Sequence, residues 1–358
     1  MAIYLDAAAS ALKPDAVLAA EYEFAKNNYA NSGRGVCPRA VAADEMVDNS
    51  RAAVAGFIGA RPENIVWTGG TTGGINMIAD ILARTALEPD SVVIVSDLDH
   101  HSARLPWQDL ADRGLCKIWI CPLDKNLNLD ADALRARVAA GGVAAVVLTA
   151  MSNVIGAAQD IKKLVAAAGS AITIIDAAQY VAHCPVNASD LGCDFLAFSM
   201  HKIGGGTGLG VLYIKNPDRW EPVRFGGGMY LASGPARFEA GTLPLVQIAG
   251  VAAAIKERGA NGKVPIKSLH DGLSEISRIK FISPRQSHLT TFVVDGMNAY
   301  DFGVLMGARG ICLRAGNMCA SWLHQYLGVP ATVRMSPGPW NTDQDIDETL
   351  HAVREILR

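Results

Sequence analysis

The sequence lacks both a strong excess of one charge and a long apolar run. Lysine and arginine number 32 against 35 aspartate and glutamate residues, so the 358-residue chain has a formal net charge of −3. A nearly neutral chain has no general attraction for phosphate backbones or anionic lipids, which argues against nucleic acid or a membrane as main partner. The longest strongly apolar run, Leu164–Ile175, is shorter than the roughly 20 residues of a membrane-spanning helix. Because Met1–Asp6 also lacks the pattern of a signal peptide, we expect a soluble, cytoplasmic protein.

Cysteine is scarce, and its pattern offers neither disulfides nor a metal site. The seven cysteines are Cys37, Cys116, Cys121, Cys184, Cys193, Cys312 and Cys319. Their odd number and the absence of a Cys-x-x-Cys pair predict reduced thiols in an intracellular protein, with no metal. Cys312 stands inside the apolar run Ile311–Leu313, a setting that favours a buried structural thiol.

Apolar runs of strand length alternate with helical patterns through most of the chain, half of which is apolar. The expected strands are 64–67, 91–96, 116–121, 143–149, 171–175, 195–198 and 210–214. The expected helices between them are 39–59, 71–83, 102–113, 131–139 and 161–168. Several strands are continuously apolar, as in sheets covered on both faces. The alternation predicts an α/β fold with a mostly parallel central sheet.

The pattern changes after about residue 242. A helix is expected over 244–257, followed by the polar stretch 258–263 and a smaller α+β unit. The strands expected in that unit are 288–294, 311–314 and 332–335. Thr342–Asp345 has the form of a capping box that opens a final helix. We expect an N-terminal segment (1–15) packed on the small domain, a large domain (16–257) and a small domain (258–358).

Two glycine-rich segments call for opposite interpretations. Gly69–Gly74 follows an apolar strand and precedes a helical pattern, so its free backbone N–H groups and the hydroxyls of Thr71 and Thr72 suit an anion such as phosphate. The spacing matches neither the ATP-binding loop nor the dinucleotide fingerprint, and a plain glycine turn is an equal alternative. Gly204–Gly210 is followed by another strand, which predicts a crossover rather than a dinucleotide site.

The strongest arrangement joins an acid and a lysine at the ends of two expected strands. Asp176 ends one buried strand, and Lys202 follows the next. The carboxyl ends of parallel strands meet at one edge of a sheet, where ligands bind. Pyridoxal phosphate needs such a pair: a lysine for the Schiff base and a carboxylate that keeps the pyridine nitrogen protonated. A surface lysine beside a helix-capping aspartate is the alternative.

Several motifs in a fixed order are similar to those of one enzyme family. The motifs are Tyr4–Ser10, Gly70–Asn76, Asp99–Ser102, Asp176–Gln179, Ser199–Lys202, Arg237–Thr242, Arg314–Ala320 and Val333–Arg334. With them the chain resembles the class V, fold type I pyridoxal-phosphate enzymes. More narrowly, it resembles the cysteine desulfurase and selenocysteine lyase branch that mobilises sulfur for iron–sulfur cluster assembly. The resemblance implies a mostly parallel central sheet flanked by helices, with a smaller α+β C-terminal domain.

The resemblance also implies how the cofactor is held. Lys202 would form the Schiff base and later move the α-proton, and Asp176 would pair with the pyridinium nitrogen. Gln179 would contact the phenolic oxygen, while His100 would lie over the ring and assist proton transfer. The residues implied for the phosphate are Thr71, Thr72, Ser199 and His201, together with Thr242 reaching from the other subunit of a homodimer. Asn153 would face both cofactor and substrate.

For the substrate, the resemblance implies two arginines and one thiol. Arg334 would clamp the carboxylate of an amino acid, with Arg314 near the same pocket. The Cys319 thiolate would attack the substrate sulfur, keep it as a persulfide, release alanine and pass the sulfur to an acceptor protein or thiol. Two features depart from close relatives: Asn317 and Met318 replace histidines before the cysteine, and the segment Gly228–Arg237 is short.

Three functions are compatible with these residues. The favoured one is a cysteine desulfurase. The second keeps pyridoxal phosphate but changes the reaction, to a selenocysteine lyase, another C–S lyase or an amino-acid epimerase. The third is a catalytically silent scaffold that binds partners, against which the joint presence of Asp176, Lys202, Arg334 and Cys319 argues, because a scaffold has no physical need for all four.

Overall fold

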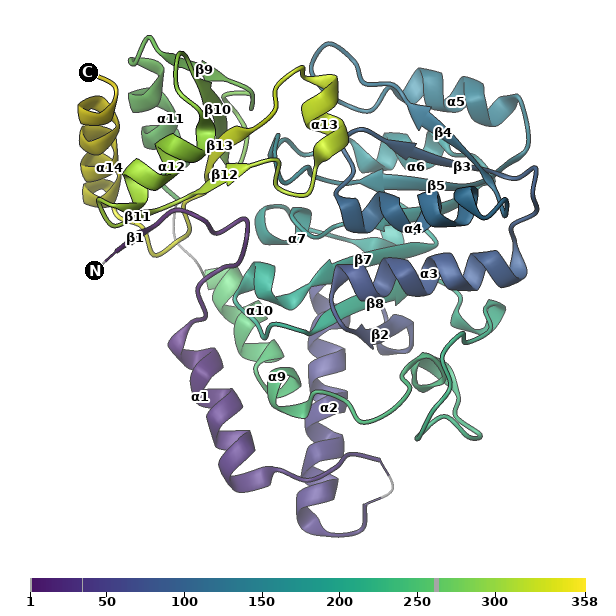
Figure 1. Ribbon diagram of the computed structural model, residues 1–358. Coiled ribbons are helices and arrows are strands. Elements are labelled where there is room, and N and C mark those ends of the chain that lie inside the picture. Colours follow the sequence, from purple (N-terminus) through teal and green to yellow (C-terminus); the bar gives the residue numbers. More distant parts are fainter. Residues whose placement is uncertain (1, 34, 261–263) are drawn as a thin grey trace.

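A seven-stranded sheet forms the centre of the larger part of the molecule (Figure 1). The computed structural model describes residues 2–33, 35–260 and 264–358. In spatial order the strands are β2 (Ile65–Thr68), β8 (Gly210–Ile214), β7 (Phe195–Ser199), β6 (Ile172–Asp176), β5 (Val143–Thr149), β3 (Val92–Ser96) and β4 (Lys117–Cys121). Only the pairings of β8 with its two neighbours are antiparallel. The prediction of a mostly parallel sheet is therefore confirmed.

Helices cover both faces of this sheet, which explains why its strands are continuously apolar. On one face, Val93 and Val95 pack with residues of α3 and α4, while Ile94, between them, belongs to the core on the other face. The helices of the large part are α1 (Asp15–Glu23), α2 (Pro38–Phe57), α3 (Thr71–Thr85), α4 (His101–Asp112), α5 (Ala131–Ala139), α6 (Ile161–Ala167), α7 (Tyr180–His183), α8 (Ala188–Leu191), α9 (Leu245–Ala249) and α10 (Val251–Ala260). Because side chains alternate along a strand, each strand contributes residues to the cores on both faces of the sheet.

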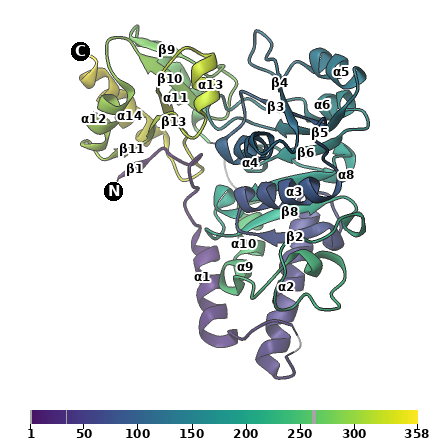
Figure 2. The same cartoon turned by 45° about the vertical axis from the view of Figure 1, so that its right-hand side comes forward.

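The C-terminal part has its own antiparallel sheet and core, set beside the large part (Figures 1 and 2). Its strands, in spatial order, are β12 (Arg314–Gly316), β13 (Thr332–Met335), β10 (Thr290–Val294) and β9 (Ile279–Phe281). Its helices are α11 (Ile266–Ser274), α12 (Ala299–Gly307), α13 (Ser321–Tyr326) and α14 (Asp343–Ile356). The predicted capping box is confirmed: the Asp345 amide donates to Thr342 Oγ1 at 3.2 Å, and the Thr342 amide donates to Asp345 Oδ2 at 2.8 Å.

The N-terminal segment runs between the two parts before it reaches α1 (Figure 1). Strand β1 (Ile3–Tyr4) pairs in parallel with β11 (Ile311–Cys312) of the C-terminal part. A few residues later, the amide of Ala11 donates to the carbonyl of His201 at 3.0 Å. This path draws residues 5–10 past the edge of the large sheet where the strands end.

Three expectations about the second half of the chain are wrong. The helix expected over 244–257 is two helices, α9 and α10, separated at Gly250, where a Cβ would lie 2.9 Å from Val17 of α1. The strand expected over 311–314 divides at Leu313, because β11 pairs with β1 whereas β12 pairs with β13. Cys312 is exposed rather than buried, since the side chains of a strand alternate and Ile311 takes the core side.

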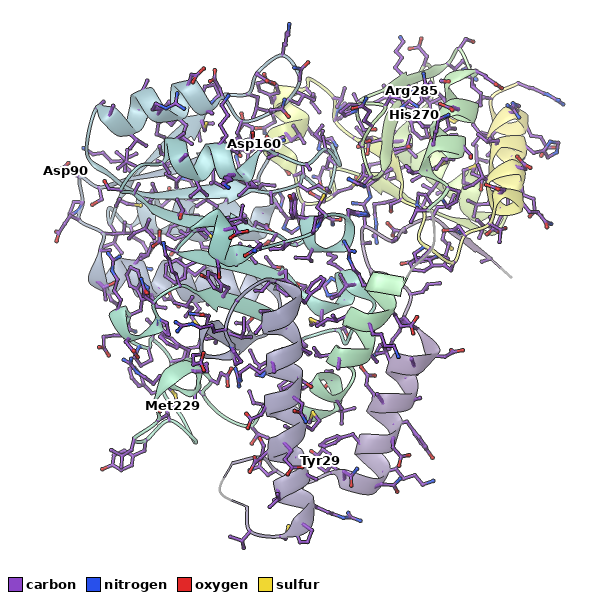
Figure 3. All side chains as sticks on the ribbon, turned by 180° about the vertical axis from the view of Figure 1, so that it is seen from behind. Tyr29, Asp90, Asp160, Met229, His270 and Arg285 are labelled. Atoms are coloured by element: carbon purple, nitrogen blue, oxygen red, sulfur yellow. The ribbon has the colours of Figure 1, made fainter. Side chains whose placement is uncertain are left out.

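Three further observations concern the rest of the molecule. Seen from behind, Tyr29 lies in the lower part of the arm formed by α1 and α2, away from the large sheet (Figure 3). Within residues 2–33, 35–260 and 264–358, no helix is long and apolar enough to cross a membrane. The same residues contain no group of His, Cys, Asp or Glu side chains arranged to hold a metal ion.

Candidate active site

A cavity of about 150 Å³ opens at the carboxyl edge of the large sheet. Strands β6 and β7 end there at Asp176 and Ser199, and helices α3 and α4 begin beside it. The structure brings nine of the predicted site residues to its wall: Thr71, Thr72, His100, Asn153, Asp176, Gln179, Ser199, His201 and Lys202. Because Asp176 ends β6 and Lys202 follows the neighbouring β7, the acid and the lysine line the same small cavity.

A glycine turn shapes one end of this cavity. Gly70 has a φ of +103°, and a Cβ there would lie 3.2 Å from the hydroxyl oxygen of Ser199. This close approach lets the Thr71 amide donate to Ser199 Oγ at 2.8 Å, with the Thr71 hydroxyl 2.9 Å from the same atom. The free N–H groups at the start of α3 and three hydroxyls, including that of Thr72, thus converge on a place suited to an anion.

Burial changes the acid–base behaviour of Asp176 and Lys202. The Asp176 carboxylate accepts only one described hydrogen bond, from the Ala178 amide at 2.9 Å, and burial raises its pKa to about 6. Burial, with the charge of Arg334, lowers the pKa of the Lys202 amine to about 8. Both groups are therefore costly to keep charged here, and a cation beside Asp176 would relieve the carboxylate.

Two histidines of the wall are neutral at physiological pH. His100 caps the N-terminus of α4: its Nδ1 accepts from the Ser102 amide at 3.2 Å, which leaves the ring proton on Nε2. Burial and the charge of Lys202 lower the pKa of His100 to about 4, and the same causes lower the pKa of His201 to about 4. Each imidazole can therefore donate or accept a hydrogen bond without adding a positive charge.

Arg334 and Arg314 share one carboxylate that sequence reasoning missed. The guanidinium of buried Arg334 donates from Nη2 to Asp6 Oδ1 at 2.8 Å, and that of Arg314 lies 2.7 Å from Asp6 Oδ2. Arg314 and Arg334 are direct cross-strand partners in β12 and β13, where two like charges repel unless an anion joins them. Two arginines that face each other across neighbouring strands predict a carboxylate between them. Nothing in the sequence near Asp6 indicates that Asp6 provides it.

Arg334 also connects this cluster of Asp6 and two arginines, the carboxylate clamp, to the cavity. Its Nη1 donates to the Asn153 carbonyl at 2.9 Å, while its Nε is buried without a partner among the described residues. The side-chain oxygen of Asn153 is likewise buried and unpartnered in that part of the chain. Since buried polar groups are almost always paired, these two atoms indicate a place for polar atoms of a ligand.

Backbone carbonyls of the N-terminal segment hold the lysine. Lys202 Nζ donates to the carbonyls of Ala8 and Ala9 at 2.8 and 3.0 Å, and Gln179 Nε2 donates to the Ala8 carbonyl at 2.8 Å. The Ala8 amide in turn donates to Ser336 Oγ at 3.0 Å. Alanine carbonyls carry no sequence signal of such a role, so the fold alone discloses it.

Cys319 is exposed on a loop that the large domain holds in a strained form. Met318 and Cys319 have φ angles of +51° and +55°, unusual for residues with side chains. The carbonyl of each accepts a hydrogen bond at 2.8 Å, from Asn153 Nδ2 and from the His101 amide respectively. His101 Nε2 also accepts from the Ser321 amide at 3.2 Å. His101 is thus a second functional residue that the sequence reasoning missed, although it stands beside His100.

Four predicted site residues do not line the cavity as the structure describes it: Thr242, Arg314, Cys319 and Arg334. Arg334 reaches it through Asn153. Thr242 is exposed, just beyond Glu239, whose carboxylate is held by Arg51 at 2.8 and 2.9 Å and accepts from the Trp67 amide at 2.7 Å. Thr242 therefore lies at the surface, three residues after the firmly held Glu239.

Comparison with known proteins agrees with this geometry. The model of the aminotransferase class-V family matches residues 3–349. A cysteine desulfurase of Pectobacterium atrosepticum is 33% identical, over 99% of this chain and 93% of that protein. A cysteine desulfurase of Yersinia pestis (strain Pestoides F) is 34% identical with the same two coverages.

Solved structures give the same result. The chain superposes on the apo structure of a cysteine desulfurase from Thermococcus onnurineus NA1 with a TM-score of 0.93 and 32% identity, covering 99% of this chain and 94% of that one. The cysteine desulfurase CsdA of Escherichia coli, in an S-sulfonic acid form, gives a TM-score of 0.91 and 33% identity, covering 100% and 96%. A NifS-like protein, at 22% identity and a TM-score of 0.90, shares the fold.

Proposed function

Because the chain belongs to the aminotransferase class-V family, we propose that it is a pyridoxal-phosphate-dependent cysteine desulfurase. It converts L-cysteine to L-alanine and holds the sulfur as a persulfide on Cys319. The observation that carries the proposal is the position of Asn153. This residue lines the cavity with Lys202, accepts from Arg334 and donates to the carbonyl beside Cys319. One residue thus connects three parts of the site: its backbone carbonyl accepts from Arg334, its side-chain amide donates to the thiol loop, and it lines the cofactor cavity.

The residues of the cavity fit pyridoxal phosphate. Thr71, Thr72, Ser199 and His201 surround the glycine turn and suit its phosphate. Asp176, buried with a raised pKa, suits its cationic ring nitrogen, and Gln179 and His100 would hold the ring. Lys202 would carry the cofactor, and its present partners, the Ala8 and Ala9 carbonyls, would be given up. When bound, the cofactor supplies a ring that stabilises negative charge on the substrate α-carbon.

The chain's own groups account for substrate binding and proton transfer. Arg334 binds the α-carboxylate, for which its unpartnered Nε is available. The Lys202 amine, whose pKa is about 8, exchanges a proton readily near neutral pH and moves the α-proton. Neutral His100 offers its Nε2 proton as a hydrogen-bond donor without opposing that transfer.

Cys319 performs the sulfur step. Its thiolate attacks the substrate sulfur, so that an S–S bond forms while the bond between the substrate Cβ and sulfur breaks. In sum, L-cysteine and the Cys319 thiol give L-alanine and a Cys319 persulfide, with no external oxidant or reductant. An acceptor thiol or protein then takes the outer sulfur and restores the thiol. The exposure of Cys319 supports such a transfer.

The same proposal covers assembly and domain organisation. We propose a cytoplasmic homodimer in which Thr242 of each chain completes the phosphate site of the other, supported by its surface position. We retain three units: the segment 1–15, a large cofactor-binding domain over 16–257 and a small domain over 258–358 that carries the Cys319 loop. The pairing of β1 with β11 supports the first of these units.

A substrate comparison tests the function. The holoenzyme is incubated with L-cysteine, L-selenocysteine and L-cysteine sulfinate, and alanine is measured with and without a reducing thiol. A persulfide enzyme forms the first equivalent of alanine from cysteine rapidly and then turns over faster when the reducing thiol takes the outer sulfur. Alanine from selenocysteine alone would make the protein a selenocysteine lyase, while racemised substrate without alanine would make it an epimerase. A protein that takes up no cofactor would be a scaffold.

A further inference from the structure

A second and larger cavity, of about 590 Å³, lies beside the active site. Gln179 and Lys202 line both cavities and so form part of a common wall. The N-terminal segment, including Ala7 and residues 11–15, contributes another wall, and the turn Pro337–Trp340 a third. The proposed desulfurase reaction uses none of this space. Its volume lies within the range of roughly 300–1,000 Å³ that small-molecule sites occupy.

Most of the cavity wall is apolar. Leu12, Ile203 and Ile266 contribute aliphatic surface, and Trp340 contributes an aromatic ring. The indole N–H of Trp340 is already used, because it donates to the Tyr4 carbonyl at 3.1 Å. The ring therefore adds apolar surface to the cavity without an unmet donor, and this part of the wall favours the hydrocarbon portion of a ligand.

The opposite character appears at Arg258 and two histidines. The Arg258 guanidinium donates to the carbonyls of Val181 and Cys184 at 3.1 and 3.3 Å, which uses two of its five N–H donors. In the described ranges no carboxylate lies within ion-pairing distance of it. His183 and His288 stack at 4.8 Å beside it, and burial with these neighbouring groups lowers the pKa of His183 to about 3. The neutral imidazoles provide further polar atoms.

The other charged groups of the wall leave Arg258 as the cation available to a ligand. Lys13 is neutralised by Glu21 at 2.8 Å, and Asp15 is the one carboxylate of the wall as the structure describes it. Lys202 also lines the wall, but in the holoenzyme it would carry the cofactor. An anion placed near Arg258 would therefore meet a cation without a carboxylate partner, next to a large apolar surface.

We propose that this cavity binds a small organic anion, with a carboxylate or sulfonate at Arg258 and an apolar or aromatic body against Trp340, Leu12 and Ile266. Neither an inorganic anion nor a neutral hydrocarbon uses both parts of the wall. The site is distinct from the carboxylate clamp at Arg334 and does not depend on the proposed reaction. Ala7, which lines this cavity, directly precedes Ala8 and Ala9, whose carbonyls accept from Lys202.

Fluorescence titration of the holoenzyme with 8-anilinonaphthalene-1-sulfonate, an aromatic anion, tests the proposal. Its uncharged counterpart, N-phenyl-1-naphthylamine, tests the role of charge. Arg258→Met removes the cation and keeps the apolar stem, Val264→Trp fills space from the cavity wall, and Arg135→Met, an exposed arginine of α5, is the control. We expect Arg258→Met to weaken sulfonate binding about tenfold, in line with loss of one charge-assisted contact. Arg135→Met should leave it unchanged.

Three further results are expected if the site is real. Val264→Trp weakens the binding of both dyes. The wild type binds the uncharged dye more weakly than the sulfonate, and Arg258→Met leaves the affinity for the uncharged dye unchanged. Equal sulfonate affinity in the wild type, Arg258→Met and Val264→Trp would overturn the site. Equal affinity of the two dyes for the wild type would overturn its preference for anions. If Arg258→Met fails to retain the cofactor, Val264→Trp and the comparison of the two dyes still test whether the cavity binds an organic anion. None of these outcomes tests alanine formation, which tests the proposed function.

Discussion

The large domain and the small domain present their reactive groups in opposite ways. Asp176 and Lys202 lie at the sheet edge of the large domain, where burial shifts both pKa values toward the neutral forms. Cys319 lies on an exposed loop of the small domain, held in position by two hydrogen bonds from the large domain. Under the proposed function, this difference corresponds to two tasks: the buried wall sets protonation for work on the substrate, and the exposed loop gives an acceptor access to the sulfur on Cys319.

Removing the exposed thiol should have the largest effect. Cys319→Ala is expected to lower thiol-dependent alanine formation from L-cysteine about a thousandfold or more, as loss of a nucleophile does. Cofactor absorbance should stay unchanged, because Cys319 does not line the cavity. Cys312→Ala, at another exposed thiol of the small domain, is the matched control and should retain normal activity. Equal losses in both variants would refute the assignment of Cys319.

Neutralising the buried acid should act on the cofactor instead. Asp176→Asn is expected to weaken pyridoxal-phosphate binding about a hundredfold, because a neutral amide cannot form the charge-assisted hydrogen bond with the cationic ring nitrogen. Equilibrium titration with the cofactor measures it. Asp194→Asn, a control at a partly buried acid that accepts from Thr173, should bind the cofactor normally. A similar loss in the control would show that the effect is not specific to Asp176.

The same variant makes a prediction about stability and pH. In the cofactor-free protein, burial raises the pKa of Asp176 from 3.8 to about 6, so the folded state binds this proton more tightly than the unfolded state. The wild type therefore loses about 3 kcal/mol of unfolding free energy as the pH rises from below 4 to above 6. Asp176→Asn should lack this loss and be the more stable cofactor-free protein at pH 8. Parallel urea-unfolding curves for the two proteins across that range would contradict the account.

Breaking the link between the arginines should have an intermediate effect. Asp6→Asn leaves Arg314 and Arg334 without their shared carboxylate, so we expect the KM for L-cysteine to rise about tenfold while kcat changes less. Unfolding free energy should fall by about 3 kcal/mol, as when a buried ion pair loses one partner. Asp295→Asn, which removes a surface pair with Lys280, serves as the control and should leave KM unchanged. An unaltered KM in Asp6→Asn would remove Asp6 from the clamp.

Loosening the thiol loop should have the smallest effect. His101→Phe keeps an aromatic ring beside Trp322 but removes the acceptor for the Ser321 amide. Hydrogen exchange at residues 319–321 should accelerate about fivefold, the factor expected from one hydrogen bond of about 1 kcal/mol. The control His351→Phe, at an exposed histidine of α14, should leave this exchange unchanged. Protection that persists in His101→Phe would show that other contacts hold the loop.

The contrast between the buried sheet and the exposed loop also explains which features could be predicted from the sequence. Continuous apolar runs located β5 and β8 to the residue, because strands buried on both faces leave an unmistakable pattern. The cavity residues followed from strand ends and motifs. Asp6, His101 and the Ala8 carbonyl were missed, since their roles arise from contacts between segments more than a hundred residues apart. The exposure of Cys312 was missed because a short apolar run does not show which of its residues faces the core.

Reduction of the holoenzyme with borohydride, followed by peptide mass spectrometry, tests the central claim most directly. The account predicts a pyridoxyl adduct on the peptide that contains Lys202 and on no other lysine. It also predicts that Lys202→Arg yields no adduct. An adduct on Lys13 or another lysine, or equal labelling of the Lys202→Arg variant, would contradict the assignment of the buried amine at the sheet edge.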